Sequence, residues 1–269
     1  MSLWLPGAPC TPRGCVEPAA PAAAVPRAVR AVLRLTAVGL LLLTGIALLP
    51  LGRRLPARSV RRWCRWIVRA VGVRVRVTGA AAPTGGLLLV ANHISWLDVP
   101  LLAAVRPARM LAKSEIRRWP VAGLLAARAG VLFIDRDRLR ALPDTVARIA
   151  GALREGAAVG AFPEGSTWCG RAQGHFRRAV FQAALDAAVP VQPVRIRYRT
   201  AQGDPVTAVA FVGDDTLLAS LWRVVSAHGV IAEVEAGVPI LPEGRTDRRA
   251  LAAAAQPEAD PARGYGHPR

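Results

Sequence analysis

The chain has 269 residues, a length that suits one α/β domain preceded by a shorter segment. Hydrophobic residues make up 52% of the chain while the formal net charge is +18, an unusual pairing for a soluble protein. Such a charge fits nucleic acid, anionic lipid or a compositional bias toward arginine. No recognisable nucleic-acid-binding module accompanies it, so we expect no nucleic-acid partner.

The chain begins with a segment, residues 1–26, that is rich in proline and alanine and is expected to be disordered. Leu35–Leu51 then runs for seventeen residues without a charge, about 26 Å as a helix, the short end of what crosses a bilayer. A signal peptide is the competing interpretation, but the upstream chain is long and no cleavage-like sequence closely follows. We expect a membrane anchor that ends at Pro50 and either spans or half-inserts.

Basic and tryptophan side chains mix directly after this apolar stretch. The segment contains Arg53, Arg54, Arg58, Arg61, Arg62, Arg65 and Arg69 together with Trp63 and Trp66. Arginine interleaved with tryptophan fits the headgroup zone of a bilayer. Residues 27–69 are therefore expected to form an anchor and an interfacial segment on an anionic membrane surface.

Short apolar runs alternate with helical stretches from about residue 70 onward. The predicted strands are Val71–Val77, Gly86–Val90, Ala108–Leu111, Val131–Ile134, Val159–Phe162, Val191–Tyr198, Val206–Phe211 and Val230–Ala236. The predicted helices are Trp96–Ala104, Ser114–Arg118 with Pro120–Ala129, Ala141–Gly151 and Phe176–Ala188. This alternation predicts an α/β fold with a mostly parallel sheet flanked by helices over residues 70–243. Residues 244–269 are expected to form a C-terminal helix and a loose tail.

The most informative motif, residues 92–98 (NHISWLD), follows the predicted strand Gly86–Val90. Side chains five positions apart on one helix point roughly 140° from each other. His93 and Asp98 can therefore meet only if His93 lies in a strand-to-helix turn and Asp98 lies in the first helical turn. An imidazole held by a carboxylate is a general base with a fixed tautomer.

A second motif, residues 162–167 (FPEGST), also follows an apolar run. With residues 130–136 (GVLFIDR) between the two motifs and 189–194 (VPVQPV) after them, the chain resembles the lysophosphatidate (1-acylglycerol-3-phosphate) acyltransferase family over roughly residues 60–240. The resemblance implies the glycerolipid acyltransferase fold, with His93 as the general base and Asp98 as its orienting partner.

The resemblance also implies an acceptor site. Substrate-binding residues are expected at Asn92, Arg136, Glu164, Gly165, Ser166 and Thr167. The guanidinium of Arg136 suits a phosphate, because its donors form a planar fork. Asn92 is also expected to help hold the turn.

One departure from the family pattern concerns the acceptor. Many members continue the FPEG block with Thr-Arg, whereas here Ser166, Thr167 and Trp168 follow. Arg171, Arg177 and Arg178 lie just downstream and are candidates to replace the missing cation. The expected reaction gives phosphatidate from lysophosphatidate; alternatives are another lysolipid such as lyso-ornithine lipid, or a non-catalytic membrane-binding protein of the same fold.

No cofactor or metal is expected. Acyl-CoA and acyl carrier protein both remain open as the thioester donor, since a basic surface suits either acidic partner. The four cysteines (Cys10, Cys15, Cys64 and Cys169) show no metal-binding pattern in sequence and are expected to be incidental reduced thiols. The expected location is the cell membrane, with the catalytic domain facing the cytoplasm.

Overall fold

The computed structural model describes residues 7–17, 24–48, 50–51, 55–118, 123, 126, 128, 130–135, 139–242 and 247–257. The strands are β1 (Arg74–Thr78), β2 (Leu87–Ala91), β3 (Arg109–Lys113), β4 (Leu132–Ile134), β5 (Ala158–Ala161), β6 (Val191–Arg199) and β7 (Ile231–Ala236). The α-helices are α1 (Pro12–Cys15), α2 (Ala24–Leu48), α3 (Ala57–Ala70), α4 (Asp98–Val105), α6 (Leu142–Arg154), α7 (Ala179–Ala187), α8 (Leu217–Ser226) and α9 (Arg248–Ala255), with short 3-10 helices at Ser114–Arg118 and Leu139–Ala141.

The described strands form one seven-stranded sheet in the order β1-β7-β6-β2-β5-β3-β4. Every neighbouring pair is parallel except β6 and β7, which are antiparallel. This confirms the prediction of a mostly parallel sheet flanked by helices. The central strand β2 is buried along its whole length, as expected for a strand with helices on both faces.

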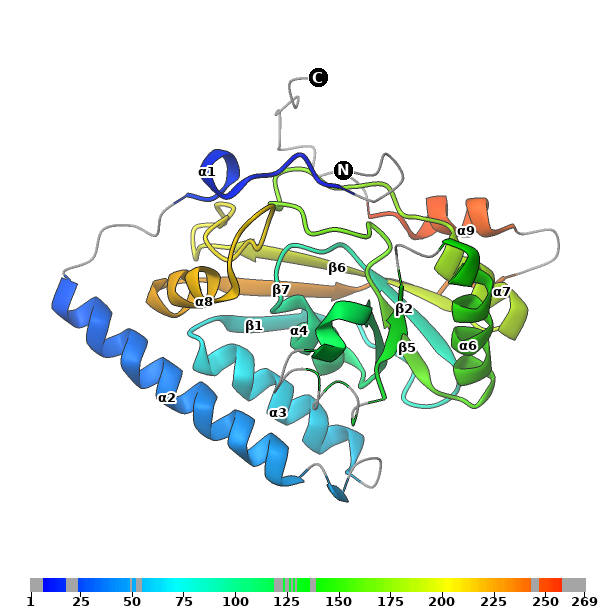
Figure 1. The fold of residues 1–269 in the computed structure, drawn as a ribbon, viewed down its shortest axis with the longest axis horizontal. Helices are drawn as coiled ribbons and strands as arrows, with labels where there is room; N and C mark the ends of the chain where they lie inside the picture. Colours follow the sequence, from blue (N-terminus) through cyan, green and yellow to red (C-terminus); the bar gives the residue numbers. More distant parts are fainter. Residues whose placement is uncertain are drawn as a thin grey trace.

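Alternate residues of β2 belong to two separate hydrophobic cores. Leu87 and Leu89 pack into the core that includes Val68 of α3 and Leu101 of α4, whereas Leu88 packs with α6, α7 and α9 on the other face. Figure 1 shows these helix layers on either side of the sheet, with the N-terminal segment that carries α1 crossing one end of the molecule.

Helix α2 lies along α3 and α8 rather than standing apart from the domain (Figure 1). The Arg34 guanidinium donates to the carbonyl of Val225 at 2.8 Å and to that of Ala227, and the Trp63 indole donates to Leu41 at 3.1 Å. Among the described residues, Val25–Leu48 is the helix long and apolar enough to cross a membrane. It ends at Leu48, two residues before Pro50, as expected.

Two sequence-based expectations differ from the structure. Residues 7–17 are not disordered: Cys10 is buried, and the Glu17 amide donates to the Thr207 hydroxyl at 3.0 Å. The predicted strand Val206–Phe211 is instead a turn-containing segment, because the Arg223 guanidinium binds the carbonyls of Ala208 and Ala210 that a strand would offer to a neighbour.

The bounds of the other predicted strands and helices agree with the structure to within a few residues wherever the structure describes them. The predicted helix at Pro120–Ala129 lies mostly outside the described residues, as does the tail after residue 257. Helix α8 was not expected from the sequence. Its N-cap is Thr216, whose hydroxyl accepts from the Ala219 amide at 3.2 Å.

Candidate active site

The turn between β2 and α4 brings His93 and Asp98 together. Asp98 is the first residue of α4, and its Oδ2 lies 2.9 Å from Nδ1 of His93. This confirms the geometric prediction that His93 lies in the turn and Asp98 in the first helical turn. Because Nδ1 faces a carboxylate, this nitrogen is the donor and Nε2 keeps its lone pair.

Asp98 is fully buried and accepts hydrogen bonds from more than the imidazole. Its Oδ2 accepts from the amides of Ile94 at 2.6 Å and Ser95 at 2.8 Å, and its Oδ1 accepts from the Tyr198 hydroxyl at 2.6 Å. These contacts fix the carboxylate, which in turn fixes the ring plane and tautomer of His93.

Tyr198 is a residue of the site that the motifs did not reveal. It belongs to β6, next to β2 in the sheet, and is buried. Burial and the nearby Asp98 charge raise the pKa of Tyr198 well above its ordinary value, so its hydroxyl stays a neutral donor. The only signal in the sequence was its position near the end of the predicted strand Val191–Tyr198.

The second motif lies beside the first because β2 and β5 are parallel neighbours. Val90 pairs with Ala161, so the residues that follow both strands meet at one edge of the sheet. The Phe162 ring stacks on the His93 ring with 4.0 Å between centroids and 9° between planes. This stacking restricts rotation of the imidazole and covers one of its faces.

Glu164 connects the two motifs through the main chain. Its Oε2 accepts from the His93 amide at 2.6 Å, and its Oε1 accepts from the Gly174 amide at 2.9 Å. Burial raises the pKa of Glu164 to about 8, although the two amide hydrogen bonds oppose this shift. The carboxyl group therefore holds the histidine turn against the loop after β5.

The other expected substrate-binding residues occupy different positions. Asn92 makes a pair of hydrogen bonds with the Ile196 main chain, at 3.0 and 2.8 Å, so it holds the turn to β6. The Thr167 hydroxyl donates to the Phe211 carbonyl. Gly165 adopts a φ of 76°, a left-handed backbone conformation that residues with a Cβ atom rarely adopt. Arg136 lies outside the described residues, and its expected role stays a prediction.

A cavity of about 460 Å³ opens next to Glu164. Its lining residues are Gly7, Glu164, Ser166, Trp168, Gly174, His175, Phe176, Arg177 and Arg178. Two of the three downstream arginines are therefore at the cavity, whereas the guanidinium of Arg171 pairs with Glu17. The arrangement offers a base at His93 and a polar, cationic cavity beside the carboxyl group that positions it.

Comparison with known proteins places the chain among acyltransferases. A family model described as Acyltransferase matches residues 74–197. A lyso-ornithine lipid O-acyltransferase of Pseudomonas aeruginosa is 40% identical over 80% of this chain and 80% of its own length. A 1-acyl-sn-glycerol-3-phosphate acyltransferase of Neisseria meningitidis is 36% identical over 66% of this chain and 70% of its own length.

A solved structure has the same fold. The 1-acyl-sn-glycerophosphate acyltransferase PlsC from Thermotoga maritima superposes with a TM-score of 0.65 at 16% identity, over 86% of this chain and 92% of the other. The sequence similarity to the two bacterial enzymes, the matching family model and the paired motifs lead to one conclusion. The chain is an enzyme of the lysophosphatidate acyltransferase family.

Proposed function

We propose that this enzyme transfers a fatty acyl group from an acyl thioester to the free hydroxyl of a lysolipid, with His93 as the general base. The observation that carries the proposal is the Nδ1 contact to Asp98 at 2.9 Å, which leaves Nε2 to take a proton. No nucleophilic side chain is needed, because the acceptor brings its own hydroxyl.

The reaction follows from this arrangement in two steps. Nε2 of His93 removes the hydroxyl proton as the acceptor oxygen attacks the thioester carbonyl carbon. The tetrahedral intermediate then expels the thiolate, and the protonated imidazole returns its proton to the leaving sulfur. Asp98 stabilises the imidazolium between these steps, and Tyr198 keeps Asp98 in place.

Lysophosphatidate is the first candidate acceptor. Arg177 and Arg178 line the cavity beside Glu164 and supply cations where the FPEG block lacks its usual arginine. A guanidinium binds a phosphate through paired hydrogen bonds. Acyl-CoA and acyl carrier protein are both candidate donors.

Lyso-ornithine lipid is the second candidate acceptor. The sequence Ser166-Thr167-Trp168 after the FPEG block favours it, as does the 40% identity to the Pseudomonas aeruginosa enzyme that is named for this substrate. Its headgroup carries a carboxylate, which the same arginines would bind.

The acceptor is tested with membranes that contain the full chain, labelled acyl-CoA and each lysolipid in turn. Arg177→Gln should raise KM for the true acceptor several-fold with little change in kcat. This is expected because the arginine binds the acceptor headgroup equally well in the ground state and in the transition state. Arg74→Gln, an exposed arginine on edge strand β1, is the matched control. Product from neither acceptor, with acyl-CoA or acyl carrier protein as donor, would contradict the proposed reaction.

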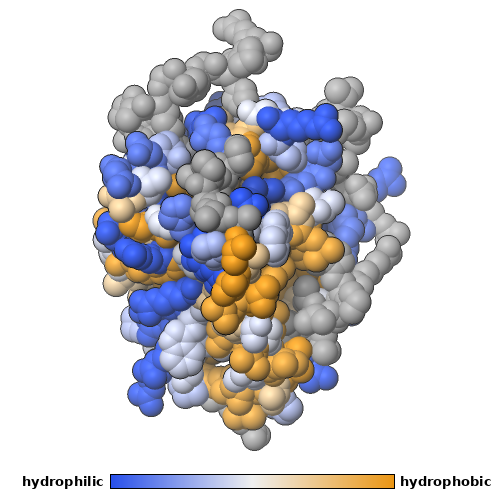
Figure 2. Space-filling view, turned by 90° about the vertical axis from the view of Figure 1, so that its left-hand side faces the viewer, coloured by the Kyte–Doolittle hydropathy of each residue, from blue (hydrophilic) through white to orange (hydrophobic). Residues whose placement is uncertain are grey.

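Membrane association is part of the proposal. Figure 2 shows apolar side chains gathered on the side of the molecule where α2 and α8 lie. The most exposed large apolar residues of these helices are Val25, Val29, Val32, Leu33, Leu40, Leu43, Leu217, Leu218 and Trp222. An exposed apolar face of this size, next to the amphipathic helix α3, suits burial in a lipid surface.

A further inference from the structure

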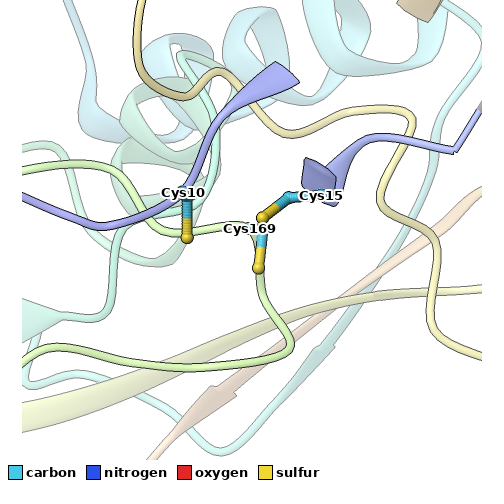
Figure 3. A group of neighbouring side chains, drawn as sticks. All are labelled: Cys10, Cys15 and Cys169. Carbon is cyan, nitrogen blue, oxygen red and sulfur yellow. The ribbon is translucent and has the colours of Figure 1, made fainter. Parts of the chain in front are cut away.

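Three of the chain's four cysteines meet at one point outside the proposed catalytic groups. Cys10 and Cys15 come from the N-terminal segment, and Cys169 follows the FPEG block; their sulfur atoms all lie within 4.8 Å of one another (Figure 3). Cys10 and Cys169 are buried, and Cys15 is partly buried. The sequence alone gives no sign of this cluster, because Cys169 is far along the chain from Cys10 and Cys15.

The backbone around the two N-terminal cysteines is built to hold them in place. Cys10 precedes Thr11, whose hydroxyl caps α1 by accepting from the Gly14 amide at 3.1 Å, and Cys15 is the last residue of α1. Two further contacts tie the segment to the domain: the Glu17 amide binds Thr207, and the Glu17 carboxylate pairs with Arg171. The three cysteines therefore lie where the N-terminal segment already contacts the domain through Glu17.

The loop that carries Cys169 directs main-chain donors at its sulfur. Gly170 adopts a φ of 84°, and the amides of Arg171 and Ala172 donate to the Cys169 side chain. Amide donors around a thiolate are the usual outer contacts of sulfur ligands in metal sites.

We propose that Cys10, Cys15 and Cys169 bind a thiophilic metal ion of the zinc or copper(I) class. Thiolates select such soft ions over magnesium or calcium. In a tetrahedral zinc site the sulfurs lie about 2.3 Å from the metal and so about 3.8 Å from one another. The three sulfurs need to move together by about 1 Å or less from their separations here to reach that geometry.

Binding at this site would also shape the acceptor cavity. Gly7 lines the cavity from the N-terminal segment, whereas Ser166 and Trp168 line it from the loop that leads to Cys169. A metal ion held by cysteines from both segments fixes one cavity wall against the other. This part of the inference rests on the proposed function, whereas metal binding itself does not.

The experiment measures metal binding by the purified full chain, prepared under a reductant and dialysed against zinc. We expect about one zinc ion per chain, released on addition of a chelator or a thiol reagent. Cys10→Ser, Cys15→Ser and Cys169→Ser should each weaken zinc binding tenfold or more. Cys64→Ser is the matched control, since Cys64 lies in α3 and burial raises the pKa of its thiol to about 12.

Cobalt(II) in place of zinc gives a second readout that does not depend on the variants folding well. Thiolate coordination in the wild-type chain should produce charge-transfer absorption in the near ultraviolet, which Cys64→Ser keeps. A wild-type chain that binds less than a tenth of an equivalent of zinc and shows no such band would overturn the proposal. So would a pair of these cysteines found as a disulfide in the reduced preparation, or zinc binding by the three variants that equals that of the wild-type chain.

Acyl transfer is measured in the same preparations and separates the two proposals. Zinc bound by an inactive chain supports the metal site and counts against the proposed function. Acyl transfer by a chain that binds no metal supports the proposed function and overturns the metal site.

Discussion

Asp98 is the residue on which the geometry of the site depends most. It is fully buried, and its two oxygens accept from one imidazole, two amides and one phenol. A buried carboxylate requires such donors, since burial without them costs several kcal/mol. The same donors fix the direction of the carboxylate, so the orientation of His93 depends on groups outside the His93 side chain.

Tyr198→Phe tests this support. The variant removes the hydroxyl that donates to Asp98 Oδ1 at 2.6 Å and leaves the ring in place. A hydrogen bond to a charged group contributes about 1.5–3 kcal/mol, so we expect kcat to fall about tenfold or more while KM for the acceptor stays nearly constant. Steady-state kinetics of the two enzymes measure both constants.

The control for Tyr198→Phe is Thr145→Val. It deletes another buried hydroxyl, that of Thr145 in α6, which donates to the Ala141 carbonyl at 3.2 Å. This variant should lose stability without losing kcat. An unchanged kcat in Tyr198→Phe would show that Asp98 does not need the phenol.

Glu164 predicts a pH dependence of stability. Its pKa is about 8 in the folded chain and near 4.5 when the chain is unfolded, so between these values the folded state binds the proton more tightly. The contribution of Glu164 to stability is therefore fully present below about pH 4.5 and is lost as the pH rises toward 8, a change of a few kcal/mol.

Glu164→Gln removes this titration. Urea unfolding of the detergent-solubilised chains at pH 5 and pH 8 should show a larger loss of stability in the wild-type chain than in the variant. The absolute stability of Glu164→Gln will also change, because an amide cannot accept from both the His93 and Gly174 amides through two oxygens. The test compares how steeply the free energy of unfolding changes with pH in the wild-type chain and in Glu164→Gln. Parallel pH profiles of the two chains would contradict a raised pKa of Glu164.

At the scale of elements, most of the sheet could be predicted because its strands are short apolar runs that end in polar motifs. Gly86–Val90 and Val159–Phe162 predict β2 and β5 closely. The pairing of His93 with Asp98 could also be predicted, since one turn contains both. Contacts between residues far apart in the sequence could not be predicted. Tyr198 reaches Asp98 only because β6 lies beside β2.

The segment Val206–Phe211 shows why an apolar pattern misleads. Its composition suits a strand, but Pro205 makes only an isolated bridge to Arg199, and Arg223 takes two of the segment's carbonyls. The Phe211 amide donates to the Ile94 carbonyl in the histidine turn. Long-range main-chain partners of this kind leave no local signal in the sequence.

The contact between α2 and α3 gives a prediction at the scale of helices. A Cβ atom placed at Gly45 would lie 2.6 Å from the Trp63 ring, whereas one at Gly39 meets nothing within 4 Å. Gly45→Val should therefore push α2 away from α3 at a cost of about 1–3 kcal/mol, as for other overpacked sites. Gly39→Val adds the same apolar volume to the same helix without this clash.

Thermal unfolding of the two variants in the same detergent tests whether α2 is packed on the domain. Gly45→Val should unfold several degrees below Gly39→Val. Equal unfolding temperatures would mean that α2 contributes no packing energy at this position, as expected for a helix that crosses the bilayer apart from the domain.

At the scale of the whole molecule, apolar and basic surfaces occur together. The chain has a net charge of +18, and α2 and α8 expose a row of large apolar side chains. Figure 2 shows apolar side chains gathered on one face with hydrophilic residues around them. Anionic lipid attracts the charge and hydrocarbon takes up the apolar face, so the two features act in the same direction.

Leu218→Glu tests this surface. Leu218 lies on α8 and is 78% exposed, so the substitution should not disturb the core. Burying a leucine side chain is favourable by about 1.5–3 kcal/mol, so binding to anionic vesicles should weaken about tenfold or more. Val238→Glu is the matched control, because Val238 is 82% exposed but follows β7. Equal losses in both variants would assign the effect to charge alone.

The central claim is that His93 removes the acceptor proton. Its most direct test is the acyl transfer rate of His93→Ala with labelled acyl thioester and a lysolipid acceptor, measured beside the wild-type chain at equal amounts in membranes. We expect the rate to fall by about 10²–10⁴-fold, the range that general base catalysis supplies, with membrane binding and fold retained. A near-normal rate in His93→Ala would contradict the role of His93 as the base.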